Sequence, residues 1–279
     1  MQKRILTIQD YSCVGRCSLT VALPTISACG IECVGIPTAV LSNHTKFKSW
    51  TFLDLTEELE KIVGKWEDYD HSFNAIYTGY LSTSQIPIVK GIIEKLKEDK
   101  TLVFIDPAMA DNGVLYAGFK PEHVEEMKTL FSVADFVKPN VTEACLMTGA
   151  SYPGNELCPM SFYEKLVFDL RKTGAKNIVL TGLKVNPGKI GILLLENGKE
   201  ATSYIEFDYL DVYFHGTGDL FSSALISLLT LGKSIQESCE IAHKYVVDSM
   251  LATLNDGRDG ELYGPSFEKA IPYLLETIK

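Results

Sequence analysis

The stretch HGTGDLFSSALISLLTLG, residues 215–232, joins a glycine-rich turn to a long apolar run. Apolar residues recur at helical spacing in this run, which predicts a core helix over Asp219–Leu231. Glycines let a ligand approach the backbone, and the free N–H groups of a helix start attract anionic oxygen. The stretch therefore predicts an anion hole with the carboxylate of Asp219 at its rim. Three residues would form the hole: Gly216, Thr217 and Gly218.

Around this stretch, short β-branched runs alternate with helical stretches. The predicted strands are Arg4–Ile8, Glu32–Val40, Ala75–Tyr80, Leu102–Ile105, Phe136–Val137 and Asn177–Leu180. The other predicted helices are Ser18–Ala28, Thr56–Trp66, Ser84–Lys97, Pro121–Ser132, Asn140–Thr148, Ser161–Thr173, Ile235–Leu254 and Ser266–Ile278. Two further extended runs, Ile190–Leu195 and Ala201–Phe207, form a hairpin around Asn197-Gly198.

Repeated strand–helix–strand units predict a mostly parallel sheet covered by helices on both faces, a three-layer α/β/α fold. No linker or repeat interrupts the pattern, so residues 1–279 are expected to form a single domain. In such a sheet the ligand crevice lies beyond the carboxyl ends of the strands. Six loops are expected to converge there, starting at Gln9, Ser42, Gly79, Asp106, Lys138 and Thr181.

The composition narrows the class of partner. A net charge of −10 and a pI near 5.1 argue against nucleic acid and anionic membranes, which require a basic surface. The first apolar run, Ile5–Ile8, is too short for a signal peptide or a membrane span, which favours a cytoplasmic protein. The seven cysteines are then expected to stay reduced. Two pairs, Cys13-x3-Cys17 and Cys29-x3-Cys33, differ from the usual zinc spacing and indicate small buried side chains.

Three acidic residues follow predicted strands or begin a helix. Asp219 could take a proton from an alcohol while the anion hole holds a phosphoryl group, or it could cap its helix. Asp106 follows the strand LVFI. Asn140 and Glu143 follow Phe136–Val137, and their spacing is also that of a capping box. Because Mg²⁺ is usually held by one or two carboxylates, water and phosphates, these residues fit a magnesium nucleotide.

Five motifs carry a family resemblance: LSNHTKFKSW from Leu41, TGYLST from Thr78, DPAMADNG from Asp106, KPNVTEA from Lys138 and HGTGD from His215. From Ile5 to about Asn255 the chain resembles the vitamin B6 (pyridoxal/pyridoxamine) kinases of the ribokinase superfamily. The resemblance implies a ribokinase-like fold and transfer of phosphate from ATP, with Mg²⁺, to the 5′-hydroxymethyl group of pyridoxal, pyridoxine or pyridoxamine. It also implies a monovalent cation such as K⁺ and a homodimer.

The resemblance also implies roles for single residues. Asp219 would be the base beside the anion hole, and Asp106 and Glu143 would organise the metal. Contacts to ATP would come from Asp111, Asn140 and Thr181, and contacts to the pyridine substrate from Thr45 and Tyr80. Structural alternatives are that Thr181 ends a strand, Thr45 caps a turn and Tyr80 packs in the core.

Two comparisons with related kinases, one at Asp10 and one at Asp219, bear on the substrate. Many B6 kinases carry Ser where this chain has Asp10, whose carboxylate would favour the ammonium group of pyridoxamine or else cap the turn at Tyr11 and Ser12. The related hydroxymethylpyrimidine kinases resemble this chain in the PNxTE and HGTG motifs, which makes hydroxymethylpyrimidine the alternative substrate, but they typically have Cys in place of Asp219, which disfavours it. A non-catalytic nucleotide- or pyridoxal-phosphate-binding protein is a further alternative, although mere binding does not need the base and both metal acids.

Overall fold

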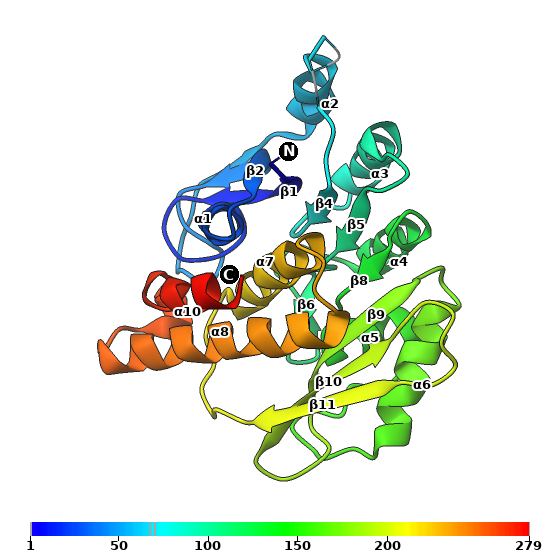
Figure 1. The fold of residues 1–279 in the computed structure, drawn as a ribbon, viewed down its shortest axis with the longest axis vertical. Coiled ribbons are helices and arrows are strands. Elements are labelled where there is room, and N and C mark those ends of the chain that lie inside the picture. The colour runs from blue at the N-terminus through cyan, green and yellow to red at the C-terminus, as the bar shows by residue number, and fades with distance from the viewer. Residues whose placement is uncertain (1, 67, 70, 279) are drawn as a thin grey trace.

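The computed structural model describes residues 2–66, 68–69 and 71–278, and its centre is one large sheet. The strands are β1 (Arg4–Ser12), β2 (Glu32–Leu41), β3 (Phe52–Asp54), β4 (Ala75–Thr78), β5 (Leu102–Ile105), β8 (Phe136–Val137), β9 (Asn177–Leu183), β10 (Lys189–Leu195) and β11 (Ser203–Asp208). Their order across the sheet is β11-β10-β9-β8-β5-β4-β1-β2-β3 (Figure 1).

The predicted mostly parallel sheet is confirmed. Strands β2, β1, β4, β5, β8 and β9 pair in parallel, and the apolar centre of this set is fully buried. The predicted hairpin is also present, because β10 pairs antiparallel with β11 and also with β9. A second antiparallel edge comes from β3 on β2.

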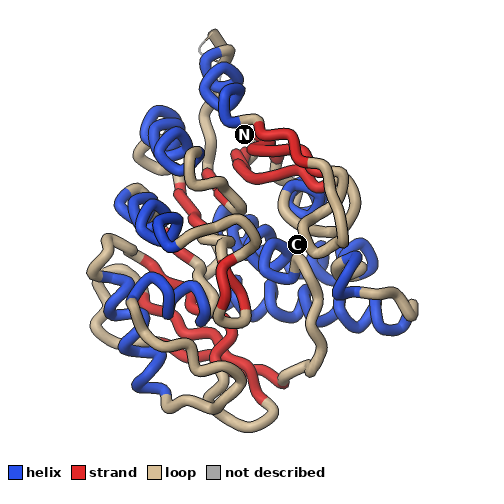
Figure 2. Tube along the Cα trace, turned by 180° about the vertical axis from the view of Figure 1, so that it is seen from behind, coloured by secondary structure: helices blue, strands red, loops and turns tan. Residues whose placement is uncertain are grey.

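Helices cover both faces of the sheet, which confirms the three layers (Figures 1 and 2). The helices are α1 (Leu19–Ala28), α2 (Thr56–Gly64), α3 (Gln85–Leu96), α4 (Pro121–Thr129), α5 (Val141–Thr148), α6 (Met160–Arg171), α7 (Thr217–Thr230), α8 (Ile235–Asn255), α9 (Gly260–Tyr263) and α10 (Ile271–Thr277). Two apolar clusters separate the layers: α2 to α6 pack against one face, and α1, α7, α8 and α10 against the other. None of the helices in the described residues is both long and apolar enough to traverse a bilayer.

Several parts of the chain differ from the sequence-based prediction, among them the short elements β3 and α9, which were not predicted. The single helix predicted over Ser266–Ile278 is wrong, because the segment is a 3-10 turn at Phe267–Lys269 followed by α10. Pro272 lies in the first turn of α10, where its missing N–H needs no partner. A small hairpin, β6 (Ala110–Asp111) with β7 (Val114–Leu115), was not predicted.

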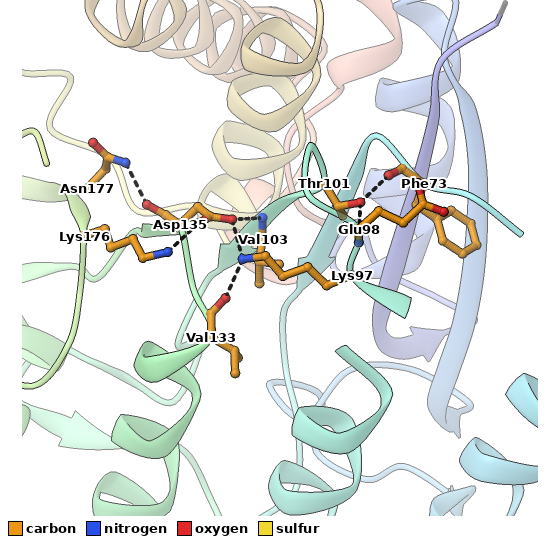
Figure 3. A network of polar contacts seen from close by, with 9 residues as sticks. All are labelled: Phe73, Lys97, Glu98, Thr101, Val103, Val133, Asp135, Lys176 and Asn177. Carbon is orange, nitrogen blue, oxygen red and sulfur yellow. Dashed lines mark hydrogen bonds and ion pairs between the residues drawn. The ribbon is translucent and has the colours of Figure 1, made fainter. Parts of the chain in front are cut away.

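Asp135 connects the amino ends of three neighbouring strands (Figure 3). Its carboxylate accepts hydrogen bonds from Lys97 Nζ at 2.9 Å, Lys176 Nζ at 2.9 Å and Val103 N at 3.0 Å. Burial opposes the charge, but the two lysines outweigh it and lower the pKa of Asp135. This cluster joins α3 to the starts of β5, β8 and β9. It therefore lies at the opposite end of these strands from their carboxyl ends, where the site is expected.

Candidate active site

A cavity of about 730 Å³ opens at the carboxyl ends of the parallel strands. All twelve predicted site residues line it: Asp10, Thr45, Tyr80, Asp106, Asp111, Asn140, Glu143, Thr181, Gly216, Thr217, Gly218 and Asp219. The expected convergence of the loops is therefore confirmed for these residues. Gln9 is an exception, because it is fully buried inside β1, which continues to Ser12.

The turn before α7 is fixed by a close backbone contact. Gly216 has a φ of +79°, and a Cβ there would stand 1.9 Å from the carbonyl oxygen of Arg16. Only glycine fits this position without displacing the backbone of residue 16. Gly216, Thr217 and Gly218 all line the cavity, and Gly218 has no side chain that would keep a ligand from the backbone of the first turn of α7, as expected of an anion hole.

Asp219 lies in the first turn of α7 but does not cap the helix. Its Oδ2 accepts a hydrogen bond at 2.9 Å from the backbone N–H of Ser18, a residue of a different segment. Burial, reinforced by the charges of Asp106 and Asp10, raises the pKa of Asp219 to about 7 in spite of this bond. The capping interpretation is therefore wrong, and a group with this pKa can accept a proton near neutral pH.

Asp106 and Lys138 form a buried ion pair beside the first turn of α7. Lys138 Nζ lies 2.8 Å from Asp106 Oδ2, which also accepts a hydrogen bond from Ser222 Oγ at 2.7 Å. Burial disfavours the charge of Lys138, but Asp106 and Glu143 outweigh burial and raise the pKa of Lys138. Sequence reasoning assigned no role to Lys138, although a lysine directly after a buried strand was a usable signal.

The predicted capping box of α5 is confirmed. Asn140 Oδ1 accepts from Glu143 N at 2.9 Å, and Glu143 Oε2 accepts from Asn140 N at 2.8 Å. The box also holds the β6–β7 hairpin, because Glu143 Oε1 accepts from Met109 N at 3.1 Å and Asn140 Nδ2 donates to Ala110 O at 2.8 Å. Both carboxylate oxygens and the amide are thus committed to the backbone, which favours indirect roles for Asn140 and Glu143 at a ligand.

The segment that follows the β6–β7 hairpin packs on Tyr80, another residue of the cavity lining, through stacked rings. Asp111 lies on β6 and lines the cavity. Phe119, which follows β7, stacks on Tyr80 with ring centroids 5.2 Å apart and on His123 at 3.8 Å. Tyr80 therefore has both a packing contact and a surface in the cavity, so the two interpretations made from the sequence are compatible.

Two histidine rings, tilted by 32° to each other, pack together beside Thr45. The rings of His44 and His215 lie 4.0 Å apart, and His44 Nε2 lies 2.8 Å from the carbonyl oxygen of Leu262. Burial lowers the pKa of His215 to about 3, so this ring is neutral. Thr45 is exposed at the cavity next to this pair.

Asp10 projects into the cavity from a bulge in β1. The register with β2 shifts between Gln9 and Tyr11, and such a bulge redirects the side chain between them. Ser12 Oγ donates to Asp10 Oδ2 at 3.0 Å, and burial raises the pKa of Asp10. Because β1 runs on to Ser12, the turn-capping alternative for Asp10 is wrong.

Thr181 lies inside β9 and bridges to Asn140, so it does not end the strand. Its N–H donates to Pro139 O at 3.1 Å.

All seven cysteines are free thiols. Within the described ranges, no group of three or more His, Cys, Asp or Glu side chains is arranged to hold a metal ion by itself.

The chain is similar to known kinases in sequence and in fold. A family model described as phosphomethylpyrimidine kinase matches residues 19–264. Pyridoxal kinase from Dictyostelium discoideum is 29% identical over 259 residues, which cover 87% of this chain and 82% of that protein. A Bacteroides thetaiotaomicron protein crystallised with pyridoxal is 33% identical, with a TM-score of 0.91 over 98% of this chain and 96% of that one. Pyridoxal kinase from Lactobacillus plantarum is 26% identical, with a TM-score of 0.89 over 99% and 98%.

Proposed function

This chain belongs to the phosphomethylpyrimidine kinase family of ribokinase-like enzymes, and from that premise we propose that it is a vitamin B6 kinase. It transfers the γ-phosphoryl group of ATP to the 5′-hydroxymethyl group of pyridoxal, pyridoxine or pyridoxamine. The observation that carries the proposal is the position of Asp219, a carboxyl group with a pKa of about 7 at the rim of an anion hole. A protein that only bound nucleotide or pyridoxal phosphate would have no use for such a base.

The reaction needs a proton acceptor and a site for charge. The oxygen of the vitamer's hydroxyl group forms a bond to the γ-phosphorus, and its proton passes to the Asp219 carboxylate. The bond between the γ-phosphorus and the bridging oxygen breaks, and ADP leaves with that electron pair. The N–H groups at Gly216, Thr217 and Gly218 face the developing charge on the phosphoryl oxygens.

Among the acidic residues, one carboxylate oxygen, Asp106 Oδ1, is free to bind the magnesium ion of a magnesium nucleotide. Asp106 Oδ1 accepts only a long bond of 3.4 Å from Ala108 N, so it is available to a cation, whereas Oδ2 is engaged by Lys138 and Ser222. Glu143 would act through metal-bound water. Mg²⁺ keeps several waters and is commonly held by one carboxylate and the substrate's phosphates, and bound there it would neutralise phosphate charge.

The second candidate is hydroxymethylpyrimidine phosphorylation, which the description of the matching family model favours. Four parallel assays distinguish the two: ATP consumption with pyridoxal, pyridoxine, pyridoxamine and hydroxymethylpyrimidine. We expect turnover with at least one B6 vitamer and a lower kcat/KM with the pyrimidine. A preference for hydroxymethylpyrimidine would replace the proposed substrate, and no turnover with any of the four would refute the proposed activity.

The homodimer and the requirement for K⁺ are further proposals that rest on the same family resemblance. The cytoplasmic location is also a proposal, and it rests on the short first apolar run, Ile5–Ile8. Light scattering of the purified protein measures its mass against the 30.9 kDa of one chain. Replacing K⁺ by tetramethylammonium in the assay tests the monovalent cation. Fractionation of the source cells tests the location.

A further inference from the structure

The ammonium group of Lys138 lies where the acidic residues and the anion hole meet. It is 2.8 Å from Asp106 Oδ2, and the charges of Glu143 and Asp219 also act on it. A Cβ on Gly218 would stand 3.6 Å from Lys138 Nζ, so the ammonium faces the first turn of α7. An anionic oxygen bound at that turn would therefore lie close to the ammonium group of Lys138.

We propose that Lys138 is a catalytic residue whose ammonium group contacts the phosphoryl group during transfer. The proposal rests on the proposed kinase function and assigns to this site a fixed cation in addition to the backbone N–H groups. As the new O–P bond forms and the bond to the bridging oxygen breaks, charge is shared among the phosphoryl oxygens and the departing ADP. Lys138 keeps its proton throughout and stabilises that charge, while Asp219 takes the hydroxyl proton.

Burial distinguishes Lys138 from an ordinary structural ion pair. The side chains of Lys138 and Asp106 are 6% and 4% exposed. The side chains of Lys97 and Asp135, which lie at the amino ends of the strands, are 28% and 20% exposed. Burying two charges costs hydration free energy, and their mutual attraction barely offsets that cost. A buried ion pair is therefore weak evidence of a stabilising role. Lys138 also lines the cavity, which a purely structural pair need not do.

The surroundings explain why a fixed cation is needed there. The side chains of Asp10, Asp106, Glu143 and Asp219 all line the cavity and would repel a triphosphate when ionised. The helix start supplies only partial positive charge. A full positive charge held by Asp106 beside Gly218 offsets this repulsion at the place where the transferred group must lie.

The test compares Lys138→Gln with Lys138→Arg. Gln retains a hydrogen-bond donor for Asp106 and removes the charge, whereas Arg retains the charge. We expect kcat to fall about 10²–10³-fold in Lys138→Gln, and less in Lys138→Arg, by analogy with removal of one anion-hole donor. Calorimetry without a vitamer gives a second readout: affinity for a non-hydrolysable ATP analogue should fall relative to affinity for ADP.

Lys97→Gln is the matched control, because it removes a lysine from the Asp135 cluster far from the cavity. Its kcat and its ratio of ATP-analogue to ADP affinity should equal those of the wild type, and thermal unfolding of each variant reports folding. Two results would overturn the proposal: a folded Lys138→Gln with kcat within about threefold of wild type, or a loss that saturating Mg²⁺ restores with an unchanged affinity ratio. The second result would mean that Lys138 only positions Asp106. Lack of turnover in the wild type would instead refute the kinase function, and the affinity ratio would still test Lys138.

Discussion

The proposed role of Asp219 as the catalytic base comes with a cost in stability. Its pKa in the folded protein, about 7, lies above the 3.8 of an exposed aspartate, so ionising Asp219 destabilises the fold. We expect Asp219→Asn to lose turnover, because Asn cannot take the proton, but to keep the hydrogen bond from Ser18. Its Tm should equal or exceed that of the wild type at pH 8, and the difference should fade as the pH falls from 7 toward 3.8. Turnover close to that of the wild type would remove Asp219 from the chemistry.

The same pKa sets the expected dependence of kcat/KM on pH. A base acts only when it is deprotonated, so kcat/KM for the vitamer should rise as the pH increases through about 7 and then level off. The pH dependence of kcat/KM reports the pKa of the free enzyme, which is the state to which this value applies. The residual activity of Asp219→Asn should not show the rise. A profile without an inflection near neutral pH would indicate that another group accepts the proton or that a different step limits the rate.

Asp10 is expected to influence which vitamer is preferred. Its carboxylate is buried at the cavity, and a charge-assisted hydrogen bond to the ammonium of pyridoxamine would contribute about 1.5–3 kcal/mol, or roughly one to two decades of preference. We therefore expect Asp10→Ser to lower kcat/KM for pyridoxamine relative to pyridoxal and pyridoxine. An unchanged ratio among the three would show that Asp10 does not select the substrate.

Single residues differ in how far the sequence could reveal them. Asp106 and Asp219 were predictable because each stands at a strand end or a helix start, positions that local patterns identify. Lys138 was not assigned because its partners, Asp106 and the turn at Gly218, are distant in sequence and are brought together only by packing. The hydrogen bond from Ser18 to Asp219 was hidden for the same reason.

At the scale of elements, α5 links stability to metal use. Glu143→Ala removes one half of the capping box and the acceptor for Met109 N, so we expect a lower Tm and a higher Mg²⁺ requirement. Ser234→Ala is the control, because Ser234 caps α8 through Glu237 N and does not line the cavity. That variant should lose about 1 kcal/mol of stability and keep the wild-type Mg²⁺ titration. Equal Mg²⁺ curves for both variants would exclude Glu143 from the metal site.

Elements were predictable where one local signal dominated. The capping box identified the start of α5, and Asn197-Gly198 identified the hairpin of β10 and β11. The β6–β7 hairpin has only two residues in each strand, and its backbone is held by Asn140, Glu143 and Thr142 from α5 and its cap. Such an element depends on tertiary contacts and leaves no periodic pattern in the sequence.

At the scale of the whole molecule, one cavity is built from both halves of the chain, so ligands should stabilise the entire fold. ADP at 100 times its Kd is expected to add about 2.7 kcal/mol to the free energy of unfolding if it binds only the folded state. Denaturant unfolding with and without ADP measures this increment. AMP at the same concentration serves as the comparison, since it lacks the β-phosphate. No increment with ADP, or an equal one with AMP, would contradict phosphate recognition at this site.

The contact between Gly216 and the Arg16 carbonyl has an evolutionary consequence. With Ser18 donating to Asp219, it joins the segment between β1 and α1 to the start of α7, two hundred residues later in the chain. Recombination between related genes that exchanged only one of these segments would pair a turn with a backbone shaped for another sequence. The two segments are therefore expected to be inherited together, and chimeras should retain activity only when both come from the same parent.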